Sequence, residues 1–273
     1  MTKNAFFTGL LLLFLFTGVD VQAQKGWEYG GWLGTSVYYG DLNNRLSVQE
    51  PGLAGGLNVR RNFNTRTATM LSLSYLRIGA DDANSPNTFE RNRNLSFHSS
   101  IFDLSAVMEF NFFDYIHDSS ENYYTPYIFG GLSMFRYNPK AELNGTTFNL
   151  RDFGTEGQAP GDEYGSFSGS LIIGGGWKWD ISEKYSLNVH IRYQKVFTDY
   201  LDDVSRTYPD FGELEATRGA TAVALSDRSL MDGIGVPGRQ RGNSKDNDAI
   251  VTLGISIMKY FGKLECPRIS DPN

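Results

Sequence analysis

Three aspartates, Asp199, Asp202 and Asp203, stand close together at the start of the longest polar segment of the chain. Carboxylate oxygens are the ligands that Ca²⁺ prefers, and the ion takes about six to eight of them. The spacing of these aspartates matches no EF-hand loop, so a weak metal-site hypothesis stands beside a second one, in which the carboxylates are solvated or paired with arginines. The sequence predicts no cofactor.

Acid–base catalysis would most readily use one of the three histidines, His98, His117 and His190. Two of them fall in predicted loops or turns and His190 falls in a predicted strand, and none stands in a pattern typical of a Ser-His-Asp triad. A triad assembled only in the fold, as in an outer-membrane protease or lipid hydrolase, remains an open alternative. The glycines of residues 235–242 lack the strand and helix that flank a phosphate-binding loop. We therefore expect no enzymatic activity and no small-molecule substrate.

The charge and the cysteine content exclude two further classes. A net charge of −6 argues against a nucleic-acid partner, which would need a basic face. Cys266 is the one cysteine, so the chain cannot form an internal disulfide. It is either a passive thiol or half of an intermolecular disulfide.

The clearest structural signal is the alternation in residues 185–194. Tyr185, Leu187, Val189, Ile191 and Tyr193 occupy one face, and the other carries Ser186, Asn188, His190, Arg192 and Gln194. A strand that crosses a lipid bilayer needs roughly ten residues, with aromatics at both ends of its apolar face. The segment therefore predicts a membrane-spanning β-strand.

Seven further segments are candidate strands that end at turn residues, and most of them alternate in the same way. They cover residues 29–40, 52–63, 67–78, 99–112, 124–137, 166–179 and 249–261. Together the eight predict an all-β fold, a transmembrane antiparallel up-and-down β-barrel. The barrel must close, because an open edge in lipid would leave backbone amides unpaired. Residues 124–137 are apolar on both faces, so their facing stays open.

The connections between these segments fall into two alternating sets. One set comprises residues 64–66, 113–123 and 180–184, and the mostly longer set comprises 41–51, 79–98, 138–165 and 196–248. Bacterial outer-membrane barrels have short periplasmic turns and long extracellular loops. This pattern predicts a barrel in the lipid of the cell outer membrane, with both mature termini in the periplasm.

A barrel of about eight strands has a lumen that side chains can fill, so we expect a plug and not a channel. Charged residues on the inward faces would then pair across the lumen, since an isolated buried charge is costly. The candidates are Arg60, Asp103, Glu109, Lys178, His190 and Arg192.

The two ends of the chain predict export and a periplasmic contact. Lys3, the apolar run 5–17 and the small residues at 21–23 predict a signal peptide over residues 1–23, followed by the barrel at 24–262. Residues 263–273 continue past the last strand as a periplasmic tail. We expect its first part to bind a periplasmic partner as an extended peptide, through Leu264, Glu265, Cys266, Pro267 and Arg268.

Three stretches of the chain resemble the PorG family of Bacteroidota outer-membrane proteins. They are Tyr-Tyr-Gly-Asp-Leu at 38–42, Phe-Thr-Asp-Tyr-Leu-Asp-Asp-Val-Ser at 197–205, and the ending at 260–268. The resemblance implies a structural component of the type IX protein secretion system, which exports proteins and in gliding species serves motility. Its implied partners are a periplasmic ring lipoprotein and that protein's own partner, of the PorK/PorN or GldK/GldN kind.

A different class of function stays open. The 196–248 connection is long enough to be functional in its own right. The alternative is therefore an independent small surface barrel of OmpX or adhesin type, which would bind ligands or cell surfaces through its outer loops.

Overall fold

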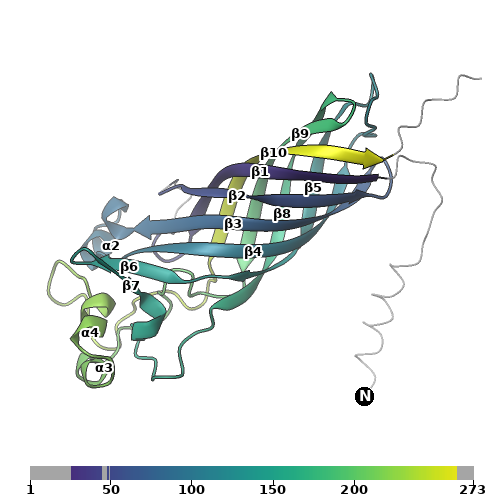
Figure 1. The fold of residues 1–273 in the computed structure, drawn as a ribbon. Coiled ribbons are helices and arrows are strands. Elements are labelled where there is room, and N and C mark those ends of the chain that lie inside the picture. Colours follow the sequence, from purple (N-terminus) through teal and green to yellow (C-terminus); the bar gives the residue numbers. More distant parts are fainter. Residues whose placement is uncertain (1–25, 45–47, 49, 263–273) are drawn as a thin grey trace, which may run out of the picture.

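The computed structural model describes residues 26–44, 48 and 50–262. Within them, eight long antiparallel strands form a closed barrel, because β10 pairs with β1 and β3 pairs with β4 (Figure 1). The strands are β1 (Gly26–Tyr39), β2 (Gly52–Asn62), β3 (Thr67–Asp81), β4 (Ser96–Asn111), β5 (Tyr124–Arg136), β8 (Phe167–Ser182), β9 (Tyr185–Val196) and β10 (Ala249–Gly262). This confirms the predicted fold class.

All other elements lie in the long connections at one end of the barrel, which we call the loop rim (Figure 1). They are η1 (Asp82–Asn84), α2 (Thr88–Arg93), the hairpin β6 (Pro139–Leu143) and β7 (Thr146–Asn149), η2 (Leu150–Phe153), α3 (Phe211–Arg218) and α4 (Ala220–Ser226). We call this assembly the cap. The opposite end carries the short connections together with Gly26 and Gly262, and we call it the turn rim.

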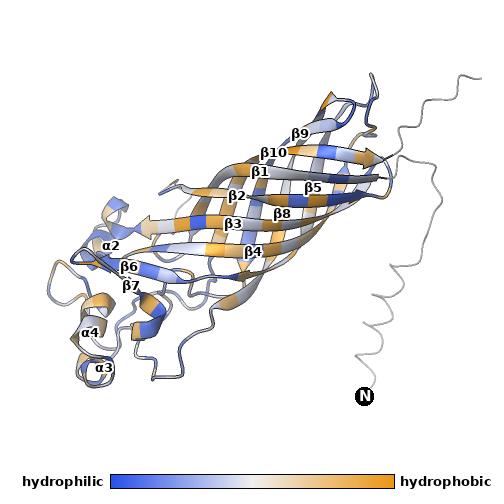
Figure 2. Cartoon of the chain, viewed as in Figure 1, coloured by the Kyte–Doolittle hydropathy of each residue, from blue (hydrophilic) through white to orange (hydrophobic). Residues whose placement is uncertain are grey.

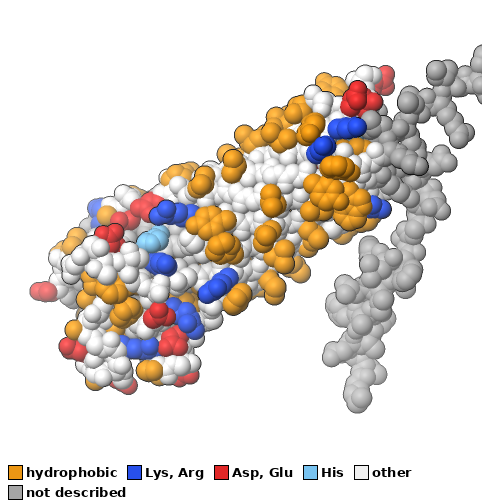
Figure 3. All heavy atoms as spheres, in the orientation of Figure 1, with side chains coloured by type: hydrophobic (Ala, Val, Ile, Leu, Met, Phe, Trp, Pro, Cys, Tyr) orange, Lys and Arg blue, Asp and Glu red, His pale blue; other side chains and the backbone are white. Residues whose placement is uncertain are grey.

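The outer wall of the barrel is apolar, as the alternation predicts. Leu33 is 70% exposed and Leu57 is 66% exposed, which no strand of a water-soluble sheet would tolerate around a whole barrel. Aromatic side chains stand at both ends of this wall, including Tyr29 and Phe261 at the turn rim and Tyr75 at the loop rim. Figure 2 shows the alternation along the strands, and Figure 3 shows apolar side chains spread over the wall. The wall has the form of a lipid-facing belt.

No helix in the part of the chain that the structure describes is long and apolar enough to cross a membrane.

Strand β5, whose facing the sequence left open, sends its aromatic residues inward. Tyr127, Phe129 and Phe135 are buried, whereas Ile128 and Leu132 face outward. The reason is spatial for Phe129, because Gly174 on the paired strand β8 leaves room in the lumen for its ring. The facing of β5 is thus set by its neighbour and not by its own hydropathy.

The structure corrects two boundaries. The connection expected at 79–98 is shorter, because β3 runs on to Asp81 and β4 begins at Ser96, so that His98 lies in a strand. The connection expected at 138–165 contains the hairpin β6–β7, which pairs with the end of β4. Both additions extend the sheet beyond the belt into the cap.

Candidate functional site

A chain of buried ion pairs fills the half of the lumen nearer the turn rim. Arg60 on β2 pairs with Glu28 on β1 (Nη1–Oε2 2.8 Å) and with Glu109 on β4 (Nε–Oε2 2.8 Å). Lys178 on β8 donates to the same Glu109 carboxylate at 2.6 Å and to Asn111 at 3.0 Å. All four charged side chains are at most 2% exposed. They hold four strands together across the lumen.

A second polar group lies closer to the loop rim. Arg192 on β9 donates to Asp103 on β4 at 2.7 Å, and Gln194 donates to the other oxygen of the same carboxylate at 3.0 Å. His190 makes no ion pair among the described residues and instead packs against the Trp32 ring, with 5.5 Å between centroids. The cavity that remains beside Trp32 and His190 has a volume of about 20 Å³, which is room for about one water molecule.

The connection between β4 and β5 folds over the turn rim. His117 is 5% exposed, pairs with Asp180 (Nδ1–Oδ1 2.9 Å) and with Glu28 (Nε2–Oε1 3.5 Å), and stacks on Tyr260 at 4.2 Å. Tyr115 donates to the same Asp180. Burial alone would lower the pKa of His117, but hydrogen bonds to Asp180 and Glu28 and the charges of these carboxylates raise it to about 9. The lumen is therefore closed at this end by a turn as well as by side chains.

The acidic motif of residues 197–205 lies inside the cap. Leu201, Asp202, Asp203 and Val204 are each at most 1% exposed. The Tyr38 hydroxyl at the end of β1 contacts Asp202 (2.6 Å) and Asp248 (2.8 Å), so two carboxyl groups share one phenol. Since one hydroxyl hydrogen cannot serve two ionised carboxylates well, this geometry favours a protonated carboxyl. The motif joins the cap to the barrel.

The two remaining aspartates of the motif have different surroundings. Asp203 accepts hydrogen bonds from Thr155 and Tyr164 and lies 3.6 Å from Arg241. Asp199 is 8% exposed and lies near the Ser205 side chain. In the described ranges no group of three or more His, Cys, Asp or Glu residues is arranged to hold a metal ion. The three aspartates are separated by their partners, and the metal hypothesis gains no support.

Burial shifts the protonation of these cap carboxyls. It raises the pKa of Asp199 to about 7 and the pKa of Asp203 to about 6. Burial and the neighbouring aspartates raise the pKa values of Asp202 and Asp248 well above their usual range. Burial also raises the pKa of Asp41 to about 6. The cap therefore holds a group of carboxyls that resist ionisation.

Two buried arginines connect the loops of the cap. Arg93 at the end of α2 pairs with Asp82 (Nε–Oδ2 2.7 Å) and donates to the Asp41 and Arg241 carbonyls at 3.0 and 2.7 Å. Arg241 pairs with Glu156 at 3.2 Å, and Glu156 in turn accepts from the backbone N–H of Ser205 at 2.8 Å. Four connections of the loop rim are thereby tied together.

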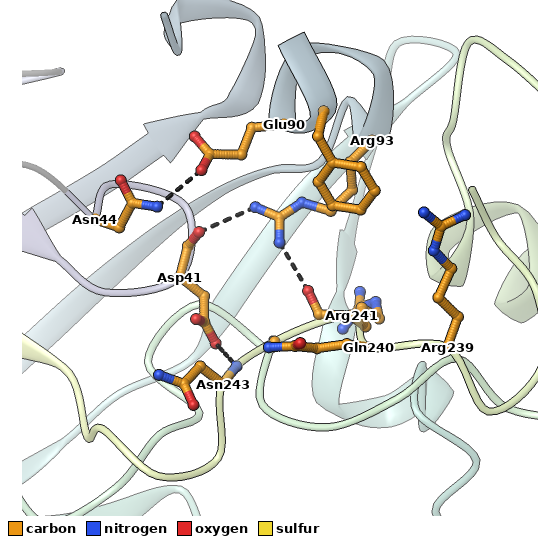
Figure 4. A pocket seen from close by; sticks show the side chains of 10 residues that line it. Asp41, Asn44, Glu90, Arg93, Arg239, Gln240, Arg241 and Asn243 are labelled. Carbon is orange, nitrogen blue, oxygen red and sulfur yellow. Dashed lines mark hydrogen bonds between the residues drawn. The ribbon is translucent and has the colours of Figure 1, made fainter. Parts of the chain in front are cut away.

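A cleft of about 400 Å³ opens in the cap between α2 and residues 239–243. Figure 4 shows Arg93 and Glu90 on one side, Arg239 on another, and Asp41 with Asn243 opposite. Most of these polar groups already have partners, since Asn44 donates to Glu90 and Asn243 donates to Asp41. Arg239 lies over the Phe89 ring at 5.3 Å.

Glu28 is a member of the lumen network that the sequence did not reveal, because the first predicted strand began at Tyr29. Extending the alternation of β1 back from Trp32 would have placed Glu28 on the inward face. Arg93 and Arg241 gave no signal, since both lie in connections without periodicity. Leu264, Glu265, Cys266, Pro267 and Arg268 lie outside the described residues.

Several solved outer-membrane barrels are similar in fold at low sequence identity. Ail, the attachment invasion locus protein of Yersinia pestis, shares 10% identity with a TM-score of 0.39, covering 88% of this chain and 100% of that one. Neisserial surface protein A shares 11% identity with a TM-score of 0.42, and the match covers 86% of this chain and 97% of that one. OprG of Pseudomonas aeruginosa shares 10% identity with a TM-score of 0.42, and the match covers 89% of this chain and 100% of that one.

A search of curated proteins finds no match. The family model described as a domain of unknown function, DUF6089, matches residues 4–218, most of the chain. The protein is thus a membrane-spanning eight-stranded barrel, and it belongs to the DUF6089 family.

Proposed function

We propose that the protein is a non-enzymatic attachment component of the outer membrane, part of the type IX secretion system, that holds a periplasmic ring lipoprotein of the PorK/PorN or GldK/GldN kind. The observation that carries attachment is the closed lumen, with its Arg60–Glu109–Lys178 network and the turn that buries His117. Because side chains fill the lumen, the two rims are the surfaces that remain for contact with a partner. The secretion-system assignment, with a role in gliding where the species glides, rests on the motifs that resemble the PorG family.

The orientation follows from the lengths of the connections. Short turns face the periplasm in bacterial outer-membrane barrels and long loops face outward. On this basis the turn rim lies in the periplasm, where Phe113 (49% exposed) and Tyr123 (45% exposed) stand beside the lumen-closing turn. We propose that this rim, together with residues 264–268, contacts the ring lipoprotein.

A deletion tests the proposed contact. Removing residues 264–273 should lower the amount of ring lipoprotein that co-purifies with the barrel, because an extended peptide contact would be lost. The barrel should still shift on gels when heated, as a closed barrel does. A matched control removes residues 159–163, which lie in the cap at the opposite rim. Unchanged recovery of the lipoprotein, or equal loss in the control, would refute the tail contact.

The closed lumen has its own test. In planar bilayers the purified protein should show no stable conductance steps, because a cavity of about 20 Å³ cannot pass hydrated ions. Regular steps would show that the lumen opens and would favour a pore.

The second candidate is an independent surface barrel that binds a ligand through its cap. The cleft between α2 and residues 239–243 favours it. Arg239→Ala would remove an exposed cation from this cleft. Under this alternative the variant loses binding to cells or ligand while export is unchanged. Under the first proposal neither changes.

A further inference from the structure

Four basic residues gather on the outer wall of the barrel at the loop rim. Arg77 on β3, His98 on β4, Arg136 on β5 and Lys140 on β6 all point outward, and we call them the basic cluster. The register brings them together, because His98 lies opposite Lys140 and Arg77 lies opposite Ser100, two residues from His98. Figure 3 shows Lys and Arg side chains around a histidine where the apolar wall meets the cap.

The basic cluster borders the lipid-facing belt directly. Tyr75 lies two residues before Arg77 on the same face, and its hydroxyl hydrogen-bonds to Ser100 (2.9 Å). Arg136 lies opposite both Phe102 and Phe167, with its guanidinium 5.9 Å from the Phe167 ring centre. Aromatic rings with polar ends mark the interface between the hydrocarbon region and the headgroups of a bilayer. The cations therefore stand at headgroup depth.

Arg77, Arg136 and Lys140 have no ion-pair partner in the described part of the chain, whereas Arg60, Arg93 and Arg192 each pair with a carboxylate. None of the ion pairs involves Arg77, Arg136 or Lys140. The charges of Arg77 and Lys140 both act on His98, with Glu142 as the opposing charge nearby. Like charges held together on one surface are unfavourable unless an anion is shared between them.

We propose that the basic cluster binds the phosphate group of a lipid in the membrane leaflet that surrounds the loop rim. Two guanidinium groups can each hold phosphate oxygens in a bidentate way, and Lys140 supplies a further point charge. The acyl chains of such a lipid would run down the wall over Leu73, Leu104 and Met134, which are 57%, 54% and 66% exposed. Headgroup and chains thus meet two adjoining surfaces of matching chemistry. The bound lipid would fix the depth of the barrel and the position of the cap above the bilayer.

Native mass spectrometry of the full protein tests this site. The protein is transferred from detergent with diphosphoryl lipid A as the probe, and dephosphorylated lipid A is measured in parallel. The variant is Arg77→Gln with Arg136→Gln. The control is Arg206→Gln with Lys245→Gln, which removes two exposed charges that lie away from the belt. We expect the first variant to bind the phosphorylated lipid about 30-fold more weakly, from two lost surface cations. The control should bind as the unchanged protein does.

Three results would overturn the proposal. These are equal binding of phosphorylated and dephosphorylated lipid, equal losses in the variant and the control, and full displacement of the lipid by inorganic phosphate, which would indicate a free-anion site. If the glutamine variant does not fold, Arg77→Lys with Arg136→Lys keeps both charges but not the bidentate geometry. This lysine variant should bind phosphorylated lipid A more weakly than the unchanged protein does, but more tightly than the unchanged protein binds dephosphorylated lipid A. Affinity equal to that for dephosphorylated lipid would contradict the role of charge.

Discussion

The lumen and the cap both bury many charged groups, but they compensate them differently. In the lumen, Glu28 and Glu109 face Arg60 and Lys178, so acids and bases are nearly balanced and every pair is direct. In the cap, Asp202 and Asp248 share the hydroxyl of Tyr38, and no cation among the described residues is paired to either. The difference indicates that the lumen is held by opposite charges, whereas this part of the cap is held by protonated carboxyls.

This contrast has a structural origin. The lumen groups stand on strands whose ladder closes on itself, so their positions do not depend on the charges. The cap is built from connections, and its loops are positioned by the same contacts that bury the carboxyls. Weakening a cap contact should therefore loosen the cap alone, and weakening a lumen contact should affect the barrel as a whole.

The largest effect is expected for Arg60→Ala. It leaves Glu28 and Glu109 buried without their main partner, which costs about 3–5 kcal/mol. The midpoint of thermal unfolding of the barrel, followed by heat-modifiability on gels, should fall well below that of Arg61→Ala, which changes the neighbouring residue on the outer face. Adding Glu28→Gln and Glu109→Gln to Arg60→Ala should restore part of the loss. Equal midpoints for the two arginine variants would show that the network does not stabilise the barrel.

Tyr38→Phe should have the next largest effect. It removes the donor between Asp202 and Asp248, at a cost of about 1–3 kcal/mol for buried groups left without a partner. The loss should appear as faster amide exchange at Leu201, whose N–H donates to Asp248, and not in the strands of the barrel. Faster exchange throughout β9 and β10 would mean that cap and barrel unfold together.

The cap should loosen as the pH rises, and the barrel should not. A carboxyl whose pKa is raised by folding contributes stability that is complete below its unfolded value of about 4 and is lost as the pH rises through the folded value. For Asp199 that value is about 7, and for Asp41 and Asp203 it is about 6. Protection factors of cap amides should therefore decrease between pH 5 and pH 8. Asp199→Asn, which cannot ionise, should flatten this profile, and an unchanged slope would refute the assignment.

The smallest effect concerns the turn that closes the lumen. The pKa of His117 is raised to about 9, so its contribution is complete below the unfolded value of about 6.5 and is lost as the pH rises through about 9. The Ile116 N–H donates to the Asn122 carbonyl at 3.0 Å. The protection factor of this amide should therefore fall above pH 9. His117→Phe preserves stacking on Tyr260 but not the ion pairs, and should exchange faster already at pH 7.

How far the sequence predicts each region follows from the same contrast. Alternation located the strands, because each must present one face to lipid and one to the lumen. It also placed Arg60, Asp103 and Arg192 on the inward faces, where the structure has them. The cap escaped prediction because Arg93 and Asp82, or Arg241 and Glu156, meet through loops without a period. For the aspartates of residues 197–205 the sequence supports a weak metal-site hypothesis beside solvated or arginine-paired carboxylates. It does not predict the burial of Asp202 and Asp203, which depends on contacts with Tyr38 and Thr155 from distant parts of the chain.

Photocrosslinking in cells tests the central claim of attachment at the turn rim most directly. A photoreactive residue is placed at Phe113 on the turn rim, and in a second strain at Val236 in the cap; both side chains are exposed. The account predicts that a periplasmic ring lipoprotein is captured from position 113 and not from position 236. Capture of no periplasmic protein from position 113, with a surface partner captured from position 236, would contradict it.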